Sequence, residues 1–464
     1  MRDLAIVAGK AVSALSRLLR RGSGLTYPGV IAERLHPPLI ADLCAGLRGG
    51  AIVVTGTNGK TTTAKMLGDA LAASHRRVVR NDSGSNLRQG IVSTLIRAAH
   101  PFGGRLRGDV AVIEVDEATL PNVAAAIAPR IVCVTNVLRD QLDRYGDLDT
   151  TGAMIAEGVA ASHGARLVLN ADDPIVAGLG VTGSSLATYY GVDDPRRAKP
   201  SSGRGSDAAR CPACGGTLHY DHVYYGHLGA WECTDCGIER PAPDFLARDV
   251  ELHAERCSFT LIGAGDEVRV DLPVGGLHNV YNALAAYACA VVAGLDGMET
   301  VAALRTFEPA FGRTEELDVS GSRVLLMLAK NPSGAEQSLA SVLADEGPSA
   351  VGIALNDHPA DGTDVSWIWD VDFESFDLTD CTFVVSGTRA EDAGVRLKYA
   401  GVDDRRLSIV RDPVEATIKL SAVASPSRGA FVLATYTAML EIRGSLTPAK
   451  DRFARLGTRL KRHA

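Results

Sequence analysis

The sequence lacks the long uncharged segments that mark exported or membrane-spanning proteins. No apolar run reaches the roughly 18 residues expected of a spanning helix. The N-terminal run over 4–8 is interrupted at Lys10, and a signal peptide needs a longer uncharged core and a small-residue cleavage site. We therefore expect an amphipathic helix over 1–22 and a cytoplasmic protein without a transmembrane segment.

An excess of positive charge is also missing. The net charge is -7 at pH 7, which argues against a protein that binds nucleic acid by bulk electrostatics. Of the residues, 46% are hydrophobic and 22% charged, as in ordinary folded proteins. A length of 464 residues exceeds what one core usually supports, so two or three domains are expected.

Buried-type strands alternate with helical segments through much of the chain. Apolar runs of strand length occur at 51–54, 110–113, 131–134 and 166–169, and later at 324–328, 350–355, 382–385 and 429–433. This alternation predicts α/β domains with doubly wound sheets. We expect a helical lead-in over 1–48, a central domain over 49–312 and a smaller C-terminal α/β domain over 313–464.

A phosphate site is predicted directly after the first strand. The segment reads Gly56-Thr57-Asn58-Gly59-Lys60-Thr61-Thr62 and opens a helix. Glycines let the backbone approach an anion, the helix N-terminus attracts it, Lys60 supplies positive charge, and the Thr61 hydroxyl is suited to Mg²⁺. The loop is shorter than the usual G-x-x-x-x-G-K-[ST]. The plain alternative is a strand-to-helix turn, which does not need Lys and Thr there.

Glu114 ends the strand at 110–113, at the edge of the sheet where ligands of α/β proteins bind. A carboxylate there can hold Mg²⁺ directly or through water. Considered alone, such a residue is more often a surface glutamate, but beside the phosphate loop it becomes a magnesium candidate.

Four of the nine cysteines form a separate cluster. Cys211-x₂-Cys214 and Cys233-x₂-Cys236, with 18 residues between the pairs, match the template of a tetrahedral zinc site. Four thiolates leave no open position, which favours structural zinc over catalytic zinc. Redox chemistry and nucleic-acid binding are the alternatives. We expect a zinc ribbon over 205–242, inserted in the central domain.

Several segments together resemble the Mur ligases, ATP-dependent carboxylate–amine ligases of peptidoglycan synthesis. They are 55–63, Glu114, Thr135-Asn136, 140–143, 170–174, 278–282 and 312–315. Two features depart from the usual pattern. Gln141 stands where the family has a magnesium-binding His, and no lysine occurs between Lys65 and Lys199 to serve as the carbamoylated lysine of many members.

Both departures resemble the MurT subtype of this family. Five further segments are also similar to that subtype: 80–86, 139–146, 330–332, 361–370 and 435–439. This resemblance implies ATP-dependent amidation of the D-glutamate α-carboxyl in the lipid II stem peptide to D-isoglutamine, at the inner face of the membrane. An acyl phosphate is the implied intermediate. Ammonia would come from a GatD-type glutaminase that docks on the C-terminal domain.

The resemblance also implies roles for individual residues. Lys60 would neutralise phosphate charge, with Thr61 and Glu114 holding Mg²⁺. The implied nucleotide-pocket residues are Asn170, Asp172, Asn279 and Arg313. Lys330, directly after a strand, would assist at the acyl phosphate, although a solvated surface lysine is an equal alternative.

An acidic, aromatic stretch follows the strand at 350–355. It holds Asp357, Asp361, Asp364, Asp370 and Asp372, together with Trp367 and Trp369. The plain interpretation is an acidic loop with a half-buried W-x-W edge strand; the functional one is a partner interface. In the MurT type of enzyme the ligase subunit lends an Asp to the glutaminase Cys–His pair. Asp364 is our first candidate and Asp370 our second.

Two rival functions remain open. A conventional ligase that joins an amino acid to a nucleotide-linked or folate-like acid would work without a glutaminase. A zinc-ribbon NTPase would bind nucleic acid in a salt-dependent way. The sequence does not decide between lipid II, lipid I and a soluble precursor as the acceptor, and it leaves the oligomeric state open.

Overall fold

The computed structural model describes residues 1–18, 26–81, 85–140, 147–182, 186–200, 208, 210–263, 265–309, 314–343, 347 and 349–446. The chain forms two compact units. The first contains Met1–Leu138, Asp147–Leu252 and Arg256–Glu308. The second is mainly Pro309–Ala464, with short segments that begin at Arg139 and His253.

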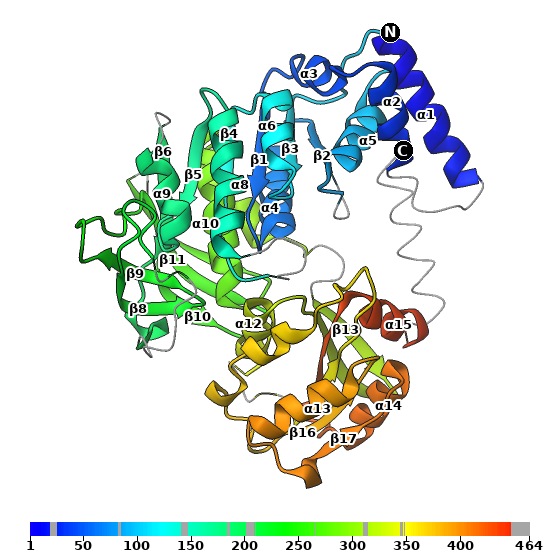
Figure 1. The fold of residues 1–464 in the computed structure, drawn as a ribbon, viewed down its shortest axis with the longest axis vertical. Helices are drawn as coiled ribbons and strands as arrows, with labels where there is room; N and C mark the ends of the chain where they lie inside the picture. Colours follow the sequence, from blue (N-terminus) through cyan, green and yellow to red (C-terminus); the bar gives the residue numbers. More distant parts are fainter. Residues whose placement is uncertain are drawn as a thin grey trace. The chain divides into compact units, whose positions relative to one another are not determined.

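The first unit is built on a sheet that has nine strands within the described residues, in the order β12-β11-β10-β6-β5-β4-β1-β3-β2 (Figure 1). The strands are β1 (Ala51–Thr55), β2 (Val78–Arg80), β3 (Val110–Glu114), β4 (Ile131–Val134), β5 (Arg166–Asn170), β6 (Ala187–Val192), β10 (Phe245–Leu252), β11 (Cys257–Gly263) and β12 (Asp266–Leu272). Pairing is parallel from β2 to β10, and β11 and β12 add an antiparallel edge. The central strands are buried on both faces, which explains their continuous apolar runs.

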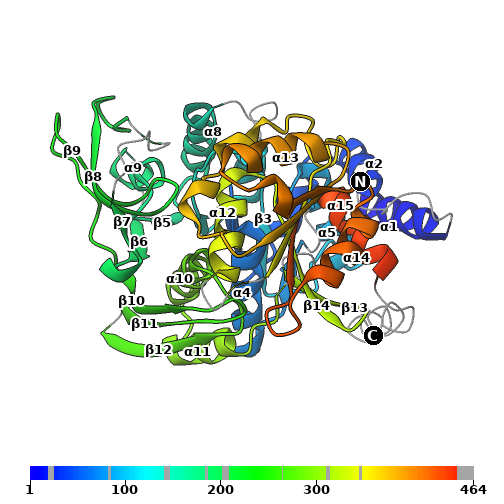
Figure 2. The same cartoon turned by 90° about the horizontal axis from the view of Figure 1, so that it is seen from below.

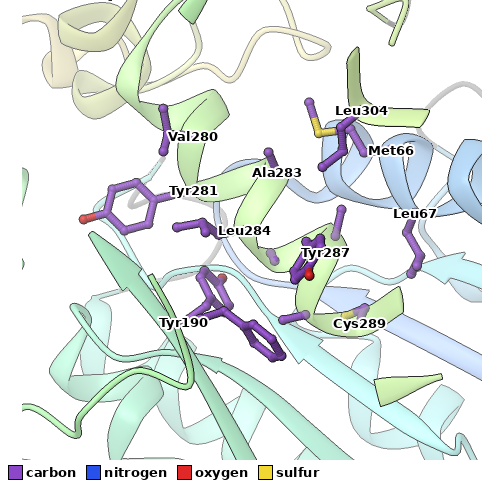
Figure 3. Packing of buried hydrophobic residues seen from close by; sticks show 14 of the residues in the cluster. Met66, Leu67, Tyr190, Val280, Tyr281, Ala283, Leu284, Tyr287, Cys289 and Leu304 are labelled. Atoms are coloured by element: carbon purple, nitrogen blue, oxygen red, sulfur yellow. The ribbon is translucent and has the colours of Figure 1, made fainter. Parts of the chain in front are cut away.

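Helices cover both faces of this sheet. The bounds are α1 (Arg2–Leu18), α2 (Tyr27–Leu35), α3 (Leu39–Cys44), α4 (Lys60–Ala73), α5 (Arg88–Ala98), α6 (Leu120–Ile127), α8 (Leu148–Ala161), α9 (Pro174–Thr182), α10 (Leu277–Val292) and α11 (Gly297–Arg305). On one face α4 and α10 pack together, and Figure 3 shows Met66 and Leu67 of α4 near the Ala283–Cys289 part of α10. Buried residues of α3, α5 and α6 form the core on the other face. The predicted doubly wound sheet is confirmed.

A small sheet, with three strands among the residues described, follows β6 in the chain. It consists of β7 (Lys199–Pro200), β8 (Leu218–Tyr225) and β9 (Leu228–Cys233), in the order β7-β8-β9. This sheet carries the cysteine cluster, in line with the predicted insertion.

The second unit has its own sheet, six-stranded over the part of the chain that is described, in the order β13-β14-β18-β15-β16-β17. The elements are β13 (Thr314–Val319), β14 (Ser322–Leu328), β15 (Ala350–Ala354), β16 (Thr382–Ser386), β17 (Leu407–Ile409), β18 (Ala430–Ala434), α12 (Pro332–Val342), α13 (Ala390–Tyr399), α14 (Pro413–Val423) and α15 (Tyr436–Leu446). Only β13 is antiparallel to its neighbour. Figure 2 shows these helices around the strands.

The predicted W-x-W edge strand is wrong. Residues Ser366–Asp370 form a short 3₁₀ helix, η2, in which Trp367 is buried and Trp369 is 46% exposed. Positions two apart in a strand lie on the same face, whereas positions two apart in a 3₁₀ turn point in different directions. One buried and one exposed tryptophan therefore fit this turn and not a strand.

Candidate functional site

The phosphate loop joins β1 to α4. Its two glycines have positive φ angles, 119° at Gly56 and 85° at Gly59. A Cβ on Gly56 would lie 2.4 Å from the Thr135 hydroxyl oxygen, and one on Gly59 would lie 2.1 Å from Oδ1 of Asn282. Both positions therefore require glycine for conformation and for space.

The N-terminus of α4 faces the loop. Its first hydrogen bond within the helix runs from the Thr63 amide to the Gly59 carbonyl, at 2.9 Å. The amides that precede Thr63 therefore point out of the helix end, where the helix dipole favours an anion. This arrangement fits the phosphate groups of a nucleotide.

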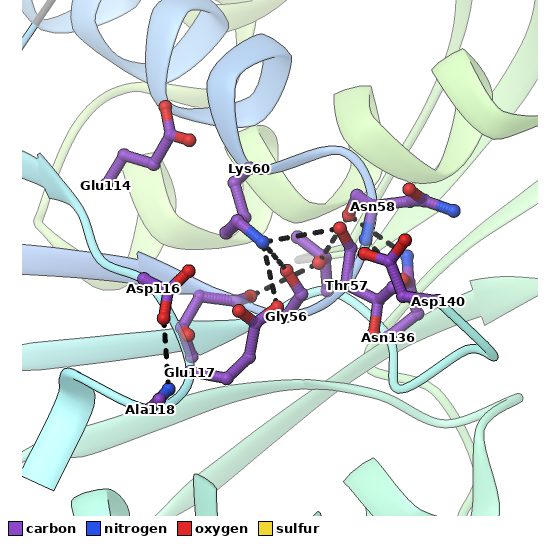
Figure 4. A network of polar contacts seen from close by, with 12 residues as sticks. Gly56, Thr57, Asn58, Lys60, Glu114, Asp116, Glu117, Ala118, Asn136 and Asp140 are labelled. Carbon is purple, nitrogen blue, oxygen red and sulfur yellow. Dashed lines mark hydrogen bonds and ion pairs between the residues drawn. The ribbon is translucent and has the colours of Figure 1, made fainter. Parts of the chain in front are cut away.

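Lys60 is buried beside the carboxylate of Glu117 (Figure 4). Its ammonium lies 2.8 Å from a carboxylate oxygen of Glu117 and donates to the carbonyl oxygens of Gly56 and Thr57. Lys60 is only 8% exposed and Glu117 4%. The lysine is thus held beside its own loop by a carboxylate that the sequence analysis did not single out.

Thr61 and Glu114 lie together, as expected of a pair that holds Mg²⁺. The Thr61 hydroxyl donates to Oε2 of Glu114 at 2.8 Å. Asn81 fixes the Glu114 backbone, because its side chain accepts from the Glu114 amide and donates to the Glu114 carbonyl. A hydroxyl and a carboxylate are hard oxygen ligands, so this donor set fits Mg²⁺.

The loop is braced from two neighbouring elements. After β4, the Asn136 side chain accepts from the Asn58 amide at 2.9 Å, and its carbonyl accepts from the Thr57 amide at 2.8 Å. From α10, Asn282 accepts from the Thr63 hydroxyl at 3.3 Å and donates to Oδ1 of Asn279 at 3.0 Å. Asn279 is therefore linked to Thr63 of α4 through the side chain of Asn282.

Asn170 and Asp172 are fully buried at the end of β5, and their polar atoms contact other protein groups. Asn170 donates to the Thr135 carbonyl and accepts from the Asp172 amide. These contacts favour a supporting role; their predicted contact with nucleotide stays a prediction. Arg313, also predicted there, lies outside the described residues, as does Gln141.

Asp172 is the centre of a buried polar cluster. It accepts from Nε of Arg240 at 2.6 Å, from the Tyr281 hydroxyl at 2.5 Å and from the Val192 amide at 2.9 Å. Burial and the Asp172 charge raise the pKa of Tyr281 well above its ordinary value, so the phenol remains a donor. Burial acts to lower the pKa of Arg240, but the charge and the hydrogen bond of Asp172, together with the neighbouring tyrosines, outweigh it and the pKa is raised.

The four cysteines converge at the tip of the small sheet. All four sulfur atoms lie within 4.8 Å of one another, with 3.7 Å from Cys211 to Cys236 and 3.6 Å from Cys214 to Cys233. A tetrahedron of sulfurs at about 2.3 Å from zinc has edges of about 3.8 Å, so the cluster fits this metal. The other five cysteines are free and buried, as expected.

Each cysteine pair forms the same tight turn. Gly215 and Gly237 follow the pairs with φ of 74°, and each donates its amide to the carbonyl of the first cysteine of its pair at 2.9 Å. The pKa of Cys233 is lowered because backbone amides of Cys236 and Asp235 donate to its sulfur. Such turns hold thiolates in position for a metal.

The small sheet is attached to the end of β5. The indole of Trp231 donates to the Ala171 carbonyl at 3.0 Å, and the Gly229 amide donates to the Asp172 carbonyl at 2.9 Å. Fully buried His227 lies 3.3 Å from an Asp173 carboxylate oxygen.

In the second unit, the acidic residues after β15 differ in their partners. Asp357 pairs with Arg389, Asp361 accepts twice from Thr437, and Asp370 pairs with Arg139 at 3.4 Å. Asp364 is half-buried and accepts from the Ser366 amide at 2.8 Å. Hydrogen bonds from Ser366 lower the pKa of Asp364, so it is ionised at neutral pH. Among the described residues, no cation forms an ion pair with Asp364.

Lys330 lies between β14 and α12, as expected. Its ammonium forms an ion pair with Asp140 at 2.7 Å, and Asn331 donates to the same carboxylate at 3.2 Å. Asp140 belongs to the second compact unit by its contacts. Lys330 is thus not simply a solvated lysine, and its predicted role at an acyl phosphate stays a prediction.

Three contributors to the loop were missed from sequence: Glu117, Asn136 as a direct brace, and Asn282. Glu117 follows β3 by three positions, and nothing in its spacing separates it from a surface glutamate. Asn136 and Asn282 lay inside segments that carried the family resemblance, so that resemblance was the available signal. In the part of the chain that is described, no helix is long and apolar enough to cross a bilayer.

Comparison with known proteins matches both units. The family model for the Mur ligase middle domain matches residues 54–201, and that for the MurT ligase C-terminal region matches 328–439. The chain is 34% identical over 443 residues to the lipid II isoglutaminyl synthase (glutamine-hydrolyzing) subunit MurT of Streptococcus pneumoniae, covering 95% of this chain and 96% of that protein. The Staphylococcus aureus (strain COL) subunit of the same name is 34% identical over 417 residues, covering 90% and 91%.

Solved structures show the same fold. A pseudomurein peptide ligase type C from Methanothermus fervidus superposes with a TM-score of 0.66 at 25% identity, covering 85% of this chain and 78% of that one. MurF from Acinetobacter baumannii gives a TM-score of 0.63 at 18% identity, covering 91% and 80%. This second likeness concerns the fold alone.

Proposed function

Because this chain belongs to the MurT family of Mur ligases, we propose that it is the ligase subunit of a glutamine-dependent enzyme that amidates lipid II. The observation that carries the proposal is 34% identity to a MurT subunit over 95% of the chain, through both compact units. The loop at Gly56–Thr62 supports it, because its glycines, helix end and lysine suit ATP.

The proposed reaction has two steps. The α-carboxylate of D-glutamate in the stem peptide attacks the γ-phosphorus of ATP, which gives an acyl phosphate and ADP. Ammonia then attacks the acyl carbon, and phosphate leaves with formation of the amide of D-isoglutamine. Lys60 would move from Glu117 to the phosphate oxygens and oppose their charge during transfer.

Thr61 and Glu114 would hold Mg²⁺, which supplies charge neutralisation on the phosphates. Asn136 and Asn282 would keep the loop backbone in a binding conformation, since they contact it from β4 and α10. Lys330, oriented by Asp140, would act on the acyl phosphate. The four cysteines would hold a structural zinc.

Ammonia would come from a GatD-type glutaminase bound to the second unit. That partner would hydrolyse glutamine to glutamate and ammonia with a Cys–His pair, and an aspartate of this chain would orient the imidazole. We place Asp364 in this role before Asp370, because Asp364 is ionised and half-buried and Asp370 already pairs with Arg139. With lipid II as substrate, the protein would work at the inner face of the membrane.

The test is amidation of lipid II by this chain co-purified with its candidate glutaminase. Mass spectrometry would follow conversion of the carboxyl to the amide, with glutamine or with ammonium as the nitrogen source. Asp364→Asn should abolish glutamine-driven amidation and leave ammonium-driven amidation intact. Asp377→Asn is the matched control, since Asp377 accepts from the Thr379 amide in the same kind of turn.

Two results would count against the assignment. If Asp370→Asn rather than Asp364→Asn shows the selective loss, the triad residue is Asp370. If the chain alone ligates a free amino acid and the glutaminase has no effect, the conventional-ligase function replaces the proposed one.

A further inference from the structure

The first helix of the chain has two apolar faces. Ala5, Ile6, Gly9 and Ser13 are buried, and α1 packs this face on α2 and α5. Met1, Leu4, Val7 and Leu15 are exposed, with Met1 at 75% and Leu4 at 56%. At 100° per residue the exposed residues of α1 lie on the side opposite the buried ones. Met1 directly precedes the helix, and exposed Ala11 lies between Val7 and Leu15, so this side forms an apolar stripe.

A second apolar group is held beside this helix. Phe102 is 77% exposed at the tip of the loop between α5 and β3. The loop is closed at its base by hydrogen bonds between His100 and Arg105 and between Arg107 and Ala98. Gly103 and Gly104 have positive φ and let it turn tightly.

The loop is fastened to the start of α1. Nη2 of Arg2 donates to the Gly103 carbonyl at 3.2 Å, and the Gly103 amide donates to Asp3 at 3.2 Å. Phe102 therefore directly precedes Gly103, the residue that contacts Arg2 and Asp3 at the start of α1. Arg2 and Asp3 lie between Met1 and Leu4 in the chain.

This surface is basic although the whole chain is acidic. The segment 97–108 contains Arg97, Arg105 and Arg107 and no carboxylate, whereas the net charge of the chain is -7. Arg105 and Arg107 are exposed. Lys10 of α1 donates to the Arg97 carbonyl at 3.1 Å, and Arg107 lies near enough to help burial lower the pKa of Lys10. Asp3, the acidic side chain that contacts the loop, is itself paired with Arg2.

We propose that α1 and the loop at 99–108 form a docking surface for an anionic lipid bilayer. Exposed Phe and Leu side chains beside arginines are what interfacial binding requires: apolar groups enter the headgroup boundary while cations meet anionic lipid. A nucleic acid would make no use of the apolar stripe. The choice of a bilayer over another partner rests on the proposed lipid-linked substrate, since docking would bring the ligase to it.

The experiment is sedimentation of the full chain with vesicles of equal parts phosphatidylglycerol and phosphatidylcholine, and with vesicles of phosphatidylcholine alone. The wild type should bind the anionic vesicles more strongly, and added salt should weaken binding. Arg105→Gln/Arg107→Gln should weaken partitioning about fivefold for each arginine. Leu4→Gln/Phe102→Gln should weaken it about tenfold or more.

The matched control residues lie in or next to α11, β11 and β6, which are elements separate from α1 and the loop at 99–108. Met298 and Leu186 are also exposed apolar residues, so Met298→Gln/Leu186→Gln should leave vesicle binding unchanged. Arg256→Gln/Arg305→Gln should weaken binding much less than the loop pair. All these positions are exposed, so each variant should keep the wild-type urea midpoint.

The proposal is overturned if the wild type does not bind anionic vesicles, if the control pairs lose as much binding as the test pairs, or if the apolar stripe instead joins two copies of the chain in solution. Amidation of detergent-solubilised lipid II separates this result from the proposed function. Amidation without vesicle binding refutes only the docking surface, and vesicle binding without amidation refutes only the proposed reaction.

Discussion

Replacement of Lys60 should destabilise the first unit as well as impair nucleotide binding. The Lys60 ammonium uses its donors on Glu117 and two loop carbonyls, and both charged side chains are nearly buried. Lys60→Met keeps a similar volume but leaves the Glu117 carboxylate buried without its cation. Loss of one partner of a buried pair costs about 3–5 kcal/mol.

Removal of both charges should restore most of that stability. In Lys60→Met/Glu117→Gln no buried charge remains, and the expected cost falls to about 1 kcal/mol from the lost hydrogen bonds. The double variant should therefore be about 2–4 kcal/mol more stable than Lys60→Met. Lys65→Met is the matched control on the same helix. Its partner Asp69 is 39% exposed, so the cost should stay below about 1 kcal/mol.

The assay is urea unfolding reported by Trp231, which is buried in the first unit. The chain has three tryptophans, and replacement of Trp367 and Trp369 by phenylalanine leaves Trp231 as the reporter. Neither Lys60 variant should bind ATP tightly in calorimetry. If the double variant is no more stable than Lys60→Met, Glu117 is not the group that Lys60 neutralises, and the reasoning fails.

Three further predictions concern other charged and metal-binding groups. Arg240→Met should lower the free energy of unfolding by about 3–5 kcal/mol, because it leaves Asp172 buried and unpaired by a cation; an unchanged urea midpoint would contradict this. Elemental analysis should find about one zinc per purified chain, and none in Cys214→Ser; a metal-free wild type would refute the zinc site. Hydrogen bonding to Arg77 is the main cause that lowers the pKa of Asp109 to about 2, so the stabilising effect of its carboxylate should be present above pH 4 and lost as the pH falls towards 2. The urea midpoints of the wild type and of Asp109→Asn should therefore converge between pH 4 and pH 2. A difference that stays constant over this range would contradict the prediction.

The fold was largely predictable because buried parallel strands leave a clear pattern. Runs such as 51–54 and 131–134 are apolar on both sides, and only a sheet covered on both faces accommodates them. The tryptophan pair in η2 was mispredicted because alternation over three residues is too short to separate a strand from a 3₁₀ turn.

The candidate site was predictable where a motif fixes the backbone. Thr61 and Glu114 meet because the carboxyl ends of adjacent parallel strands, β1 and β3, bring them together. Glu117 could not be assigned, since only the turn after β3 carries it back to Lys60. Asp172 was assigned to the nucleotide pocket, but its contact with Arg240 joins positions 68 residues apart, a pairing that no local pattern reveals.

The same contacts connect the cysteine cluster to the phosphate loop through continuous structure within the first unit. The small sheet holds the Ala171–Asp173 turn through Trp231 and Gly229. Within that turn, Oδ2 of Asp173 accepts from the Val137 amide at 2.7 Å. Val137 directly follows Asn136, whose side chain holds the phosphate loop. Because buried polar networks of this kind are rigid when every member is satisfied, a metal that orders the cysteine turns would also steady the segment that braces the loop.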